Sequence, residues 1–261
     1  MRRTLVLLTI SAIPALFAGC DFDGGDRIVE EIFEQTYQVD PAATLSLSNQ
    51  DGSIGIYGAD ITEIRLQAIK KAYSAERLGK ISVKVAAAPD SVSITTSYPP
   101  RKRWGLGDRS GTVDYILVVP QTCKISNASL ANGEILIDGM RGESVNAHLK
   151  NGRLYGRNCF SNVRLSVSTG GLDIDYDWWE QSKFSINVEV ENGGIHAFIP
   201  AHASFRLSAD AESGRISNDF AEQEQRHHDD HKIDMSIGPA PGPEVTLRAR
   251  DGNIEIGATG P

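Results

Sequence analysis

The sequence predicts an all-β protein built as a repeat-based β-solenoid with one short helix, and three observations lead to this prediction. Apolar and polar residues alternate over short segments, as in strands with one buried face. Each segment contains a glycine: in Val145–Leu154, apolar or small residues lie seven, five and three places before Gly152 and two places after it. The pattern recurs along the chain, and its repeat glycines are Gly52, Gly133, Gly152, Gly170, Gly193, Gly214 and Gly252.

The spacing of the repeat glycines favours a solenoid. From Gly133 to Gly214 successive glycines are 19, 18, 23 and 21 residues apart, which suits one coil of two short strands and two corners. The last spacing, from Gly214 to Gly252, is 38 residues, close to two periods, so one repeat between them is expected to be missing. At the corners the glycines are expected to adopt a positive φ, which other residues rarely tolerate.

The same pattern has a second interpretation. Asn-Gly or Asp-Gly with apolar residues three places before and two places after the glycine also suits a two-residue type I′ turn, which would pair the flanking strands as a hairpin. An antiparallel, hairpin-based β-sandwich is therefore the alternative fold. We favour the solenoid because a near-constant period is typical of stacked repeats.

The start of the chain has the features of a bacterial lipoprotein signal peptide. Two arginines follow Met1, residues 4–17 are largely apolar, and Leu16-Phe-Ala-Gly-Cys20 resembles the lipobox that precedes an acylated cysteine. The apolar run is shorter than the roughly 20 residues that a spanning helix needs. We predict a signal peptide over 1–19, an acylated Cys20 with a tether over 20–27, and an exported protein anchored by lipid to a bacterial cell membrane. The alternative, a secretory signal cut elsewhere, also exports the chain.

Residues 28–256 are expected to form a single β-repeat domain. Irregular N-terminal strands are predicted over 28–120 and regular repeats over 121–256, with a polar loop at 219–233 in place of the missing repeat. Alternation predicts N-terminal strands near 45–56, 81–85, 92–96 and 113–119. A short helix is predicted over 74–79, because Ser74 is a good N-cap and Gly79 is typical of a helix end.

Several of these elements, in this order, resemble a known family. The Asn49–Ile54 corner, the Val113–Pro120 strand and the serial Asn-Gly repeats look like a bacterial family of β-strand-repeat proteins of unknown function, whose label as adhesins is itself an inference. The resemblance covers roughly residues 30–256. It implies a β-helical solenoid and a location in the cell envelope, and it supplies no catalytic residues.

Charge and cysteine content exclude some classes of function and stabilisation. Without residues 1–19 the chain has 26 − 2 = 24 basic and 34 acidic residues, a formal charge of −10, so nucleic acid is not an expected partner. Three cysteines are too few for a disulfide scaffold. Cys123 and Cys159 occupy similar places in repeats that are two coils apart, or roughly 9–10 Å. This exceeds the roughly 7 Å limit for a disulfide, so both thiols are expected to be free and buried.

Two aromatic segments are candidate ligand surfaces. The basic stretch with Arg101, Arg103 and Trp104 would suit an anionic glycan or a lipid headgroup, although a solvated hairpin loop has the same composition. Trp178 and Trp179 would suit stacking against a carbohydrate. The alternative is that one indole covers the apolar layer at a corner, because paired tryptophans usually bury much of their area.

Metal binding and catalysis are supported only weakly by the sequence. His227, His228 and His231 are of a type that binds transition metals, but a polar loop without a visible scaffold favours solvated side chains, and no cofactor is expected. Asp173, Asp175 and Asp177 alternate outward along one strand, a spacing that a glycan-active enzyme could use. No nucleophile-elbow, metalloprotease or phosphate-loop motif is present in the sequence.

The sequence therefore predicts a non-enzymatic, lipid-anchored envelope protein. Its solenoid surface would bind a protein or glycan partner, as in an adhesin, or act as a structural spacer. The alternative function is an envelope glycan-active lyase or hydrolase built on a β-helix.

Replacing Cys20 with alanine should release the protein from membranes, because the acylated cysteine would be its anchor. The measurement is membrane fractionation combined with incorporation of labelled palmitate. A variant that still fractionates with membranes, together with wild-type protein that takes up no palmitate, would contradict the lipoprotein assignment.

Overall fold

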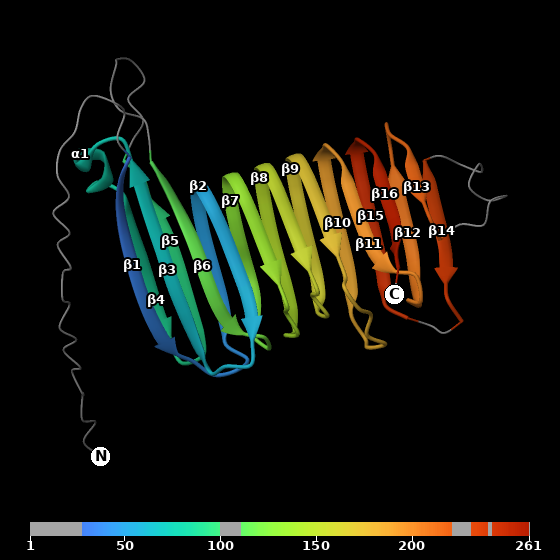
Figure 1. Cartoon of the computed structure of the whole chain (residues 1–261), viewed down its shortest axis with the longest axis horizontal. Coiled ribbons are helices and arrows are strands. Elements are labelled where there is room, and N and C mark those ends of the chain that lie inside the picture. Colours follow the sequence, from blue (N-terminus) through green and yellow to red (C-terminus); the bar gives the residue numbers. More distant parts are fainter. Residues whose placement is uncertain (1–27, 100–110, 221–230, 240–241, 261) are drawn as a thin grey trace.

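The computed structural model describes residues 28–99, 111–220, 231–239 and 242–260, which form a β-solenoid of stacked coils (Figure 1). The elements are β1 (Val29–Gln38), β2 (Thr44–Ala59), β3 (Glu63–Ala72), α1 (Ala75–Leu78), β4 (Ser82–Ala88), β5 (Ser91–Ser97), β6 (Thr112–Pro120), β7 (Lys124–Asp138), β8 (Ser144–Arg157), β9 (Asn162–Asp175), β10 (Ser185–Asn192), β11 (Ile195–Pro200), β12 (Phe205–Ala211), β13 (Ile216–Asn218), β14 (Lys232–Ile237), β15 (Glu244–Asp251) and β16 (Ile254–Thr259).

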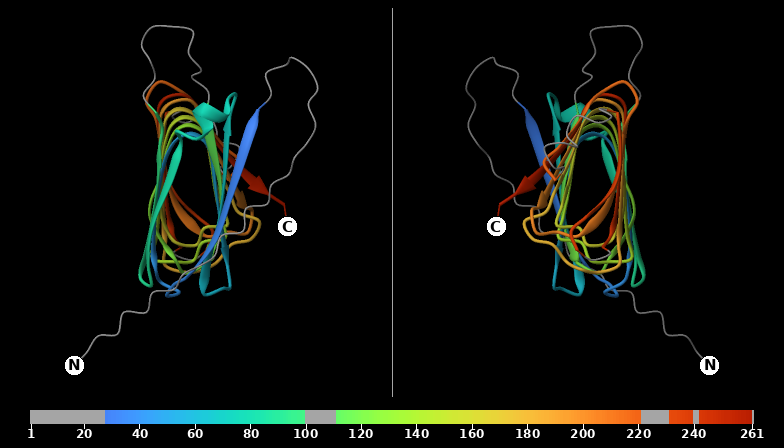
Figure 2. Two further views of the ribbon diagram at one scale, coloured as in Figure 1. Left: turned by 90° about the vertical axis from the view of Figure 1, so that its left-hand side faces the viewer. Right: turned by 90° about the vertical axis from the view of Figure 1, so that its right-hand side faces the viewer.

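The regular part of the stack is made by long strands that bend at their repeat glycine. β7, β8 and β9 pair in parallel, with Gly133 opposite Gly152 and Gly152 opposite Gly170. The halves before and after each glycine form the two long sides of a coil, as the view along the stack shows (Figure 2). Each half pairs with the next coil rather than with the other half of its own coil. The solenoid prediction is therefore confirmed, and the hairpin alternative is wrong for these repeats.

Alternation along the strands fills the interior between the two sides. In β8, Val145, Ala147, Leu149 and Leu154 are buried, while the residues between them face outward. The corresponding apolar positions of β7, β9, β10 and β15 are buried as well. Burial of these side chains depends on stacking, because one coil alone would leave its inward face open to water.

The repeat glycines stack into a column at one corner of the coils. An added Cβ on Gly152 would overlap the carbonyl oxygen of Gly133, and one on Gly170 would overlap that of Gly152. The φ angles of Gly52, Gly133, Gly152, Gly170 and Gly193 lie between 128° and 142°, which confirms the expected positive φ. Gly214 and Gly252 do not share this φ, so the expectation is wrong there. They too need to be glycine, because an added Cβ would overlap the carbonyl of the neighbouring glycine.

The order of the coils differs from the order of the chain at the C-terminal end. The last repeat, β15 and β16, lies between the coil of β10 and β11 and the coil of β12 and β13. β14 then pairs antiparallel with the outer edge of β12. Between Gly214 and Gly252 the described residues form no further coil, in agreement with the expected missing repeat. The long spacing of these two glycines arises because the chain adds an edge strand before it returns into the stack.

Antiparallel strands also close the N-terminal end of the stack. β6 pairs in parallel with the second half of β2, β3 pairs antiparallel with β6, and β1 pairs antiparallel with β3. On the other side, β5 pairs with the first half of β2, and β4 pairs antiparallel with β5. The predicted short helix is confirmed as α1, where the Ser74 hydroxyl accepts a hydrogen bond from the Arg77 amide at 3.2 Å. At four residues, this one helix of the described segments is far too short to span a membrane.

The two cysteines of the repeats are free and buried, as expected. Gly142, in the coil between them, lies against the backbone of Cys123, so the two thiols are separated by an intervening coil. The Cys123 thiol donates a hydrogen bond to the Ala43 carbonyl at 2.9 Å, and the Cys159 thiol donates one to the Arg157 carbonyl at 3.1 Å. Burial raises the pKa of Cys123 to about 11 and that of Cys159 to about 12.

Replacing Gly152 with alanine should lower the free energy of unfolding by about 3 kcal/mol or more, through backbone strain and overlap with Gly133. Gly171 is the matched control, because an added Cβ there would lie 3.6 Å from its nearest neighbour, a flexible arginine side chain. Chemical denaturation of both variants is the measurement. Equal stability of the two variants would contradict the proposed role of the column.

Both thiols should resist alkylation in the native protein, because they are buried and their raised pKa values leave little thiolate at neutral pH. A protein lacking Cys20 should show two reactive thiols in denaturant and none on the same time scale without it. Mass spectrometry after labelling makes this measurement. Rapid labelling of either cysteine in the native state would contradict the described burial.

Candidate functional site

The structure describes only part of the residues singled out in the sequence. Cys20, Arg101, Arg103, Trp104, His227 and His228 lie outside the described residues. His231 is exposed just before β14, and its backbone carbonyl accepts a hydrogen bond from Ala211. Within the described segments, no group of three or more His, Cys, Asp or Glu residues is placed to hold a metal ion.

The two adjacent tryptophans lie in the connection between β9 and β10 and have different surroundings. The ring of Trp179 lies 5.2 Å from Tyr176 and 5.5 Å from both Phe184 and Phe205, centroid to centroid. Its indole Nε1 donates a hydrogen bond to the Ser204 carbonyl at 3.2 Å. Trp179 therefore covers the apolar layer, which is one of the two roles considered for this pair.

Trp178 instead presents much of its ring to solvent, with 43% of its surface exposed. Its ring centroid lies 5.6 Å from that of Phe160, and its Nε1 donates a hydrogen bond to Glu180 at 3.0 Å. The two indoles thus do not form a joint platform. Trp178 alone is placed to stack against a ligand.

Trp178 belongs to a set of side chains at the corner opposite the glycine column, where three successive connections stack. Arg141 lies with its guanidinium carbon 5.1 Å from the centroid of the Phe160 ring. The same Arg141 forms an ion pair with Glu180 at 2.6 Å. We call Arg141, Phe160, Trp178 and Glu180 the aromatic corner. Their contacts join three consecutive coils. The positions of these side chains are therefore held by more than one loop.

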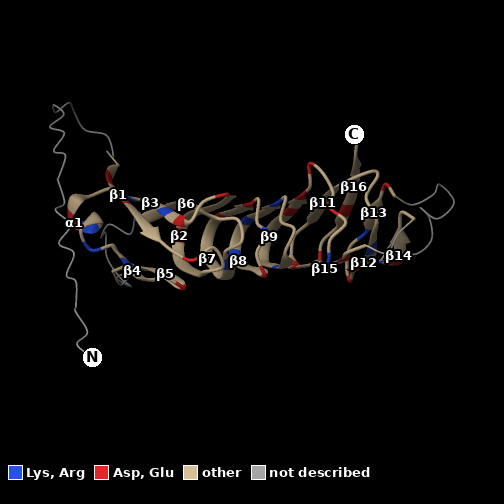
Figure 3. Ribbon diagram, turned by 90° about the horizontal axis from the view of Figure 1, so that it is seen from below, with Lys and Arg blue, Asp and Glu red and all other residues tan. Residues whose placement is uncertain are grey.

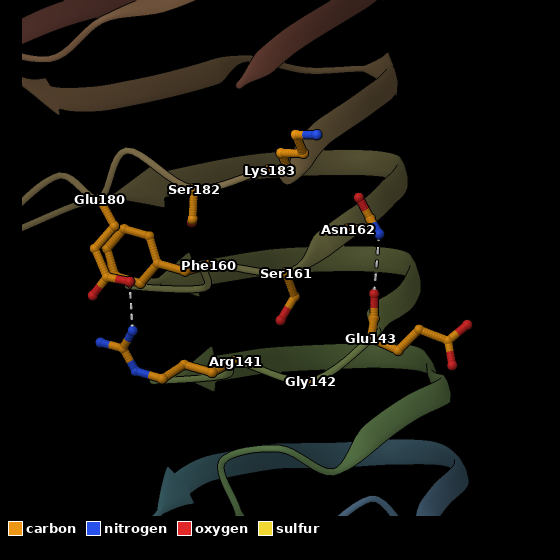
Figure 4. A pocket seen from close by; sticks show the side chains of 9 residues that line it. All are labelled: Arg141, Gly142, Glu143, Phe160, Ser161, Asn162, Glu180, Ser182 and Lys183. Carbon is orange, nitrogen blue, oxygen red and sulfur yellow. Dashed lines mark hydrogen bonds and ion pairs between the residues drawn. The ribbon is translucent and has the colours of Figure 1, made fainter. Parts of the chain in front are cut away.

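A pocket of about 400 Å³ lies beside the aromatic corner (Figure 4). It is lined by Arg141–Glu143 from the first connection, by Phe160 to Asn162 from the second, and by Glu180, Ser182 and Lys183 from the third. We call this cavity the corner pocket. Its volume falls within the range of small-molecule binding sites.

Most polar groups of the corner pocket have partners within the protein. Although burial acts to raise it, hydrogen bonds from Arg141 and Trp178 lower the pKa of Glu180 below its usual value. Glu143 forms an ion pair with Lys124 at 3.1 Å. The Asn162 amide donates to the Glu143 carbonyl at 3.2 Å and accepts from the Ser185 hydroxyl at 3.2 Å. Glu180 therefore remains ionised at neutral pH.

Two polar groups of the pocket have no such partner among the described residues. Ser161 is only 2% exposed, and its hydroxyl oxygen makes no hydrogen bond within the described part of the chain. Lys183 is exposed and forms no ion pair with any described side chain. Unsatisfied buried hydroxyls are uncommon in folded proteins. The pocket thus has polar groups available for an additional hydrogen-bonding partner.

Asp173, Asp175 and Asp177 lie on β9 and just after it, and we call them the acidic row. Their side chains contact residues of neighbouring coils. Asp173 accepts hydrogen bonds from Arg153 at 2.7 Å and from His196 at 2.8 Å, and these lower its pKa although burial opposes them. Asp177 accepts hydrogen bonds from Asn158 at 2.8 Å and from Arg157 at 3.3 Å. Burial, reinforced by the charge of Asp177, raises the pKa of Asp175. The row therefore links neighbouring coils.

Basic and acidic residues are interspersed along the length of the molecule (Figure 3). In this view no long stripe of Lys and Arg runs along the described ribbon, which agrees with the net formal charge of −8 for the whole chain.

The sequence patterns indicate Trp178 as a candidate binding residue, but they do not indicate Arg141, Phe160, Ser161 or Lys183. The connections at this corner differ in length and composition, so no periodicity marks which side chains meet there.

Comparison with known proteins gives a family and a fold. The model of the Toastrack DUF4097 family matches residues 36–257. A solved structure described as a putative cell adhesion protein from Clostridium sporogenes is 14% identical and has a TM-score of 0.53. The match covers 89% of this chain and 100% of that chain. Among curated proteins, none matches the chain significantly.

Two further solved structures are similar at a lower level. A putative adhesin from Bacteroides fragilis is 10% identical with a TM-score of 0.36, over 87% of this chain and 97% of that one. A putative lipid binding protein from Parabacteroides distasonis is 8% identical with a TM-score of 0.33, over 86% of this chain and 96% of that one. At these identities the likeness concerns the fold alone.

Proposed function

Because the chain belongs to the Toastrack DUF4097 family, we propose that it is an adhesin-like, non-enzymatic protein of the cell envelope that uses its solenoid to bind a glycan or protein partner. In this proposal Cys20 carries the lipid that anchors the protein to a bacterial cell membrane. The signal-peptide pattern of the sequence supports the proposed anchor, and the surface of the solenoid supports the proposed binding role.

The observation that carries the binding role is the aromatic corner with its adjacent pocket. A spacer needs only stacked coils, whereas here an indole that is 43% exposed contacts Phe160 and Glu180, and these two residues line a pocket of about 400 Å³ with charged and hydroxyl groups. Exposed aromatic rings beside polar groups are common at recognition sites. The corner pocket therefore favours a binding protein over a spacer.

The proposed anchor would leave this surface accessible. The nine residues from Cys20 to Ile28 can span at most about 30 Å, so the lipid would hold the β1 end of the stack near the membrane. The aromatic corner lies on β7 to β10, away from β1 along the stack (Figure 1). A partner in the envelope would thus meet the corner without displacing the anchored end.

The alternative of a glycan-active enzyme gains no specific support from the acidic row. Asp173 and Asp177 are each held by side chains of neighbouring coils, an arrangement that stabilises stacking. A catalytic pair would instead need one carboxyl group positioned to act as an acid and another as a base or nucleophile around a free space.

A soluble form that begins at Asp21 should co-sediment saturably with bacterial envelope preparations and leave the length of their polysaccharides unchanged. Replacing Trp178 with alanine should weaken this binding by about tenfold, because an exposed anchor ring would be lost. Sedimentation at increasing protein concentration gives the affinity, and gel filtration of the polysaccharides gives their size.

Tyr73→Ala is the matched control, since Tyr73 is 57% exposed and lies after β3 at the other end of the stack. Equal loss of binding in both variants would contradict a site at the aromatic corner. Shortened polysaccharides would instead support the enzyme alternative.

A further inference from the structure

We propose that the corner pocket binds a single acidic sugar residue, a hexuronate-type ring with one carboxylate, within an envelope glycan. This inference rests on the proposed binding function and names the ligand class of that site. It is argued from the construction of the pocket, its unsatisfied hydroxyl and the balance of its charges.

The pocket is built by the fold rather than by one loop. Its walls come from three consecutive connections, those between β7 and β8, β8 and β9, and β9 and β10. Hydrogen bonds between the connections, such as Asn162 to Glu143 at 3.2 Å and Arg141 to Glu180 at 2.6 Å, hold the walls together (Figure 4). An open pocket of about 400 Å³ with walls held in this way has room for one sugar ring with its substituents.

Ser161 provides an unsatisfied hydrogen-bonding group at the centre of this lining. Figure 4 shows its side chain between the Gly142 corner and the loop that carries Ser182. A buried hydroxyl without a partner costs free energy, which is recovered when a ligand hydroxyl supplies the missing hydrogen bond. A serine that is 2% exposed and without a partner in the described chain is therefore placed to recognise a polyhydroxylated ligand.

The carboxylates of the lining have acceptor capacity left for sugar hydroxyls. An ionised carboxylate offers about four acceptor sites. The carboxylate oxygens of Glu180 accept hydrogen bonds from Arg141 and Trp178, and one oxygen of Glu143 accepts a hydrogen bond from Lys124. The remaining sites can accept hydrogen bonds from neighbouring hydroxyls of a sugar ring.

The charge balance selects a ligand with one negative charge. Arg141 and Lys124 neutralise Glu180 and Glu143, which leaves the ammonium group of Lys183 as the lining cation without an ion-pair partner among the described residues. One carboxylate on the ligand would pair with Lys183. A phosphate dianion would bring a second charge close to two glutamates, and like charges at short range repel.

The test is calorimetric titration of the soluble protein with trigalacturonate, an acidic trisaccharide, and with galactotriose, a neutral one. The acidic trisaccharide should bind more tightly. Lys183→Gln should weaken its binding by about tenfold and leave the neutral trisaccharide unaffected, because only a charge-assisted hydrogen bond is lost. Lys150→Gln, which changes an exposed lysine of β8 outside the pocket, should have no effect.

Two further variants test the pocket itself. Ser182→Tyr should fill the cavity from its exposed rim and abolish binding, whereas Gln181→Tyr, on the neighbouring exposed residue outside the lining, should not. Ser161→Ala should reduce affinity for both trisaccharides without lowering the melting temperature, since its hydroxyl has no partner within the described protein. A lower melting temperature with unchanged affinity would assign Ser161 a structural role and contradict the proposal.

The outcomes separate this inference from the proposed function. Equal affinity for the two trisaccharides, or an acidic trisaccharide whose binding is insensitive to Lys183→Gln, would overturn the acidic-sugar assignment. Failure to bind either trisaccharide while the protein still co-sediments with envelopes would overturn the pocket inference and leave the proposed function standing. Failure of both binding experiments would overturn both.

Discussion

The close approach of backbone at the glycine column is the constraint on which the rest of the structure depends. At this corner the carbonyl of one glycine occupies the place that a Cβ of the next would need, as between Gly133 and Gly152. The coils can therefore lie in register only if each places a glycine there. Register in turn decides which side chains face inward, since a shift of one residue would move the apolar set to the surface. The buried interior thus follows from a contact that involves no side chain.

The opposite corner of the coils is under no such constraint, and this freedom is where functional variation can arise. The β7–β8 and β8–β9 connections are short, whereas the β9–β10 connection is long enough to hold both tryptophans. Stacked glycines hold the strand ends that support these connections, so their side chains sit on a rigid base. Loops on a fixed scaffold commonly carry binding residues. The aromatic corner and the corner pocket occupy this variable edge.

Sequence patterns predicted which residues of a strand face inward, because this is a local property. They did not predict which coils are neighbours, because that depends on residues far apart in the sequence. Alternation around Gly170 identified its inward residues, because period-two burial is a property of each strand by itself. The same pattern cannot say which coil lies beside which. Val245 of the last repeat pairs with both Ile186 and Leu207, and nothing in its own segment marks it as the strand between them. The corner pocket was missed for a related reason, since Ser161 and Lys183 come to line one pocket only through stacking.

The ends of the stack are built so that stacking stops. Parallel coils alone would leave an open edge at each end, ready to pair with another chain. Here the N-terminal end and the β12 side of the C-terminal end turn to antiparallel strands that carry charged residues, whereas the other side of the C-terminal end stops at the short parallel strand β13. Glu31 of β1 pairs with the largely buried Lys70 at 2.8 Å, and Asp234 of β14 pairs with Arg206 at 2.9 Å. At the C-terminal end the last repeat also lies inside the stack rather than at its edge: β12 pairs with β15, β13 pairs with β16, and β14 pairs with the outer edge of β12. Because charged edges discourage further strand pairing, the glycine column yields a rod of defined length rather than a fibre, with its variable corner left on the side.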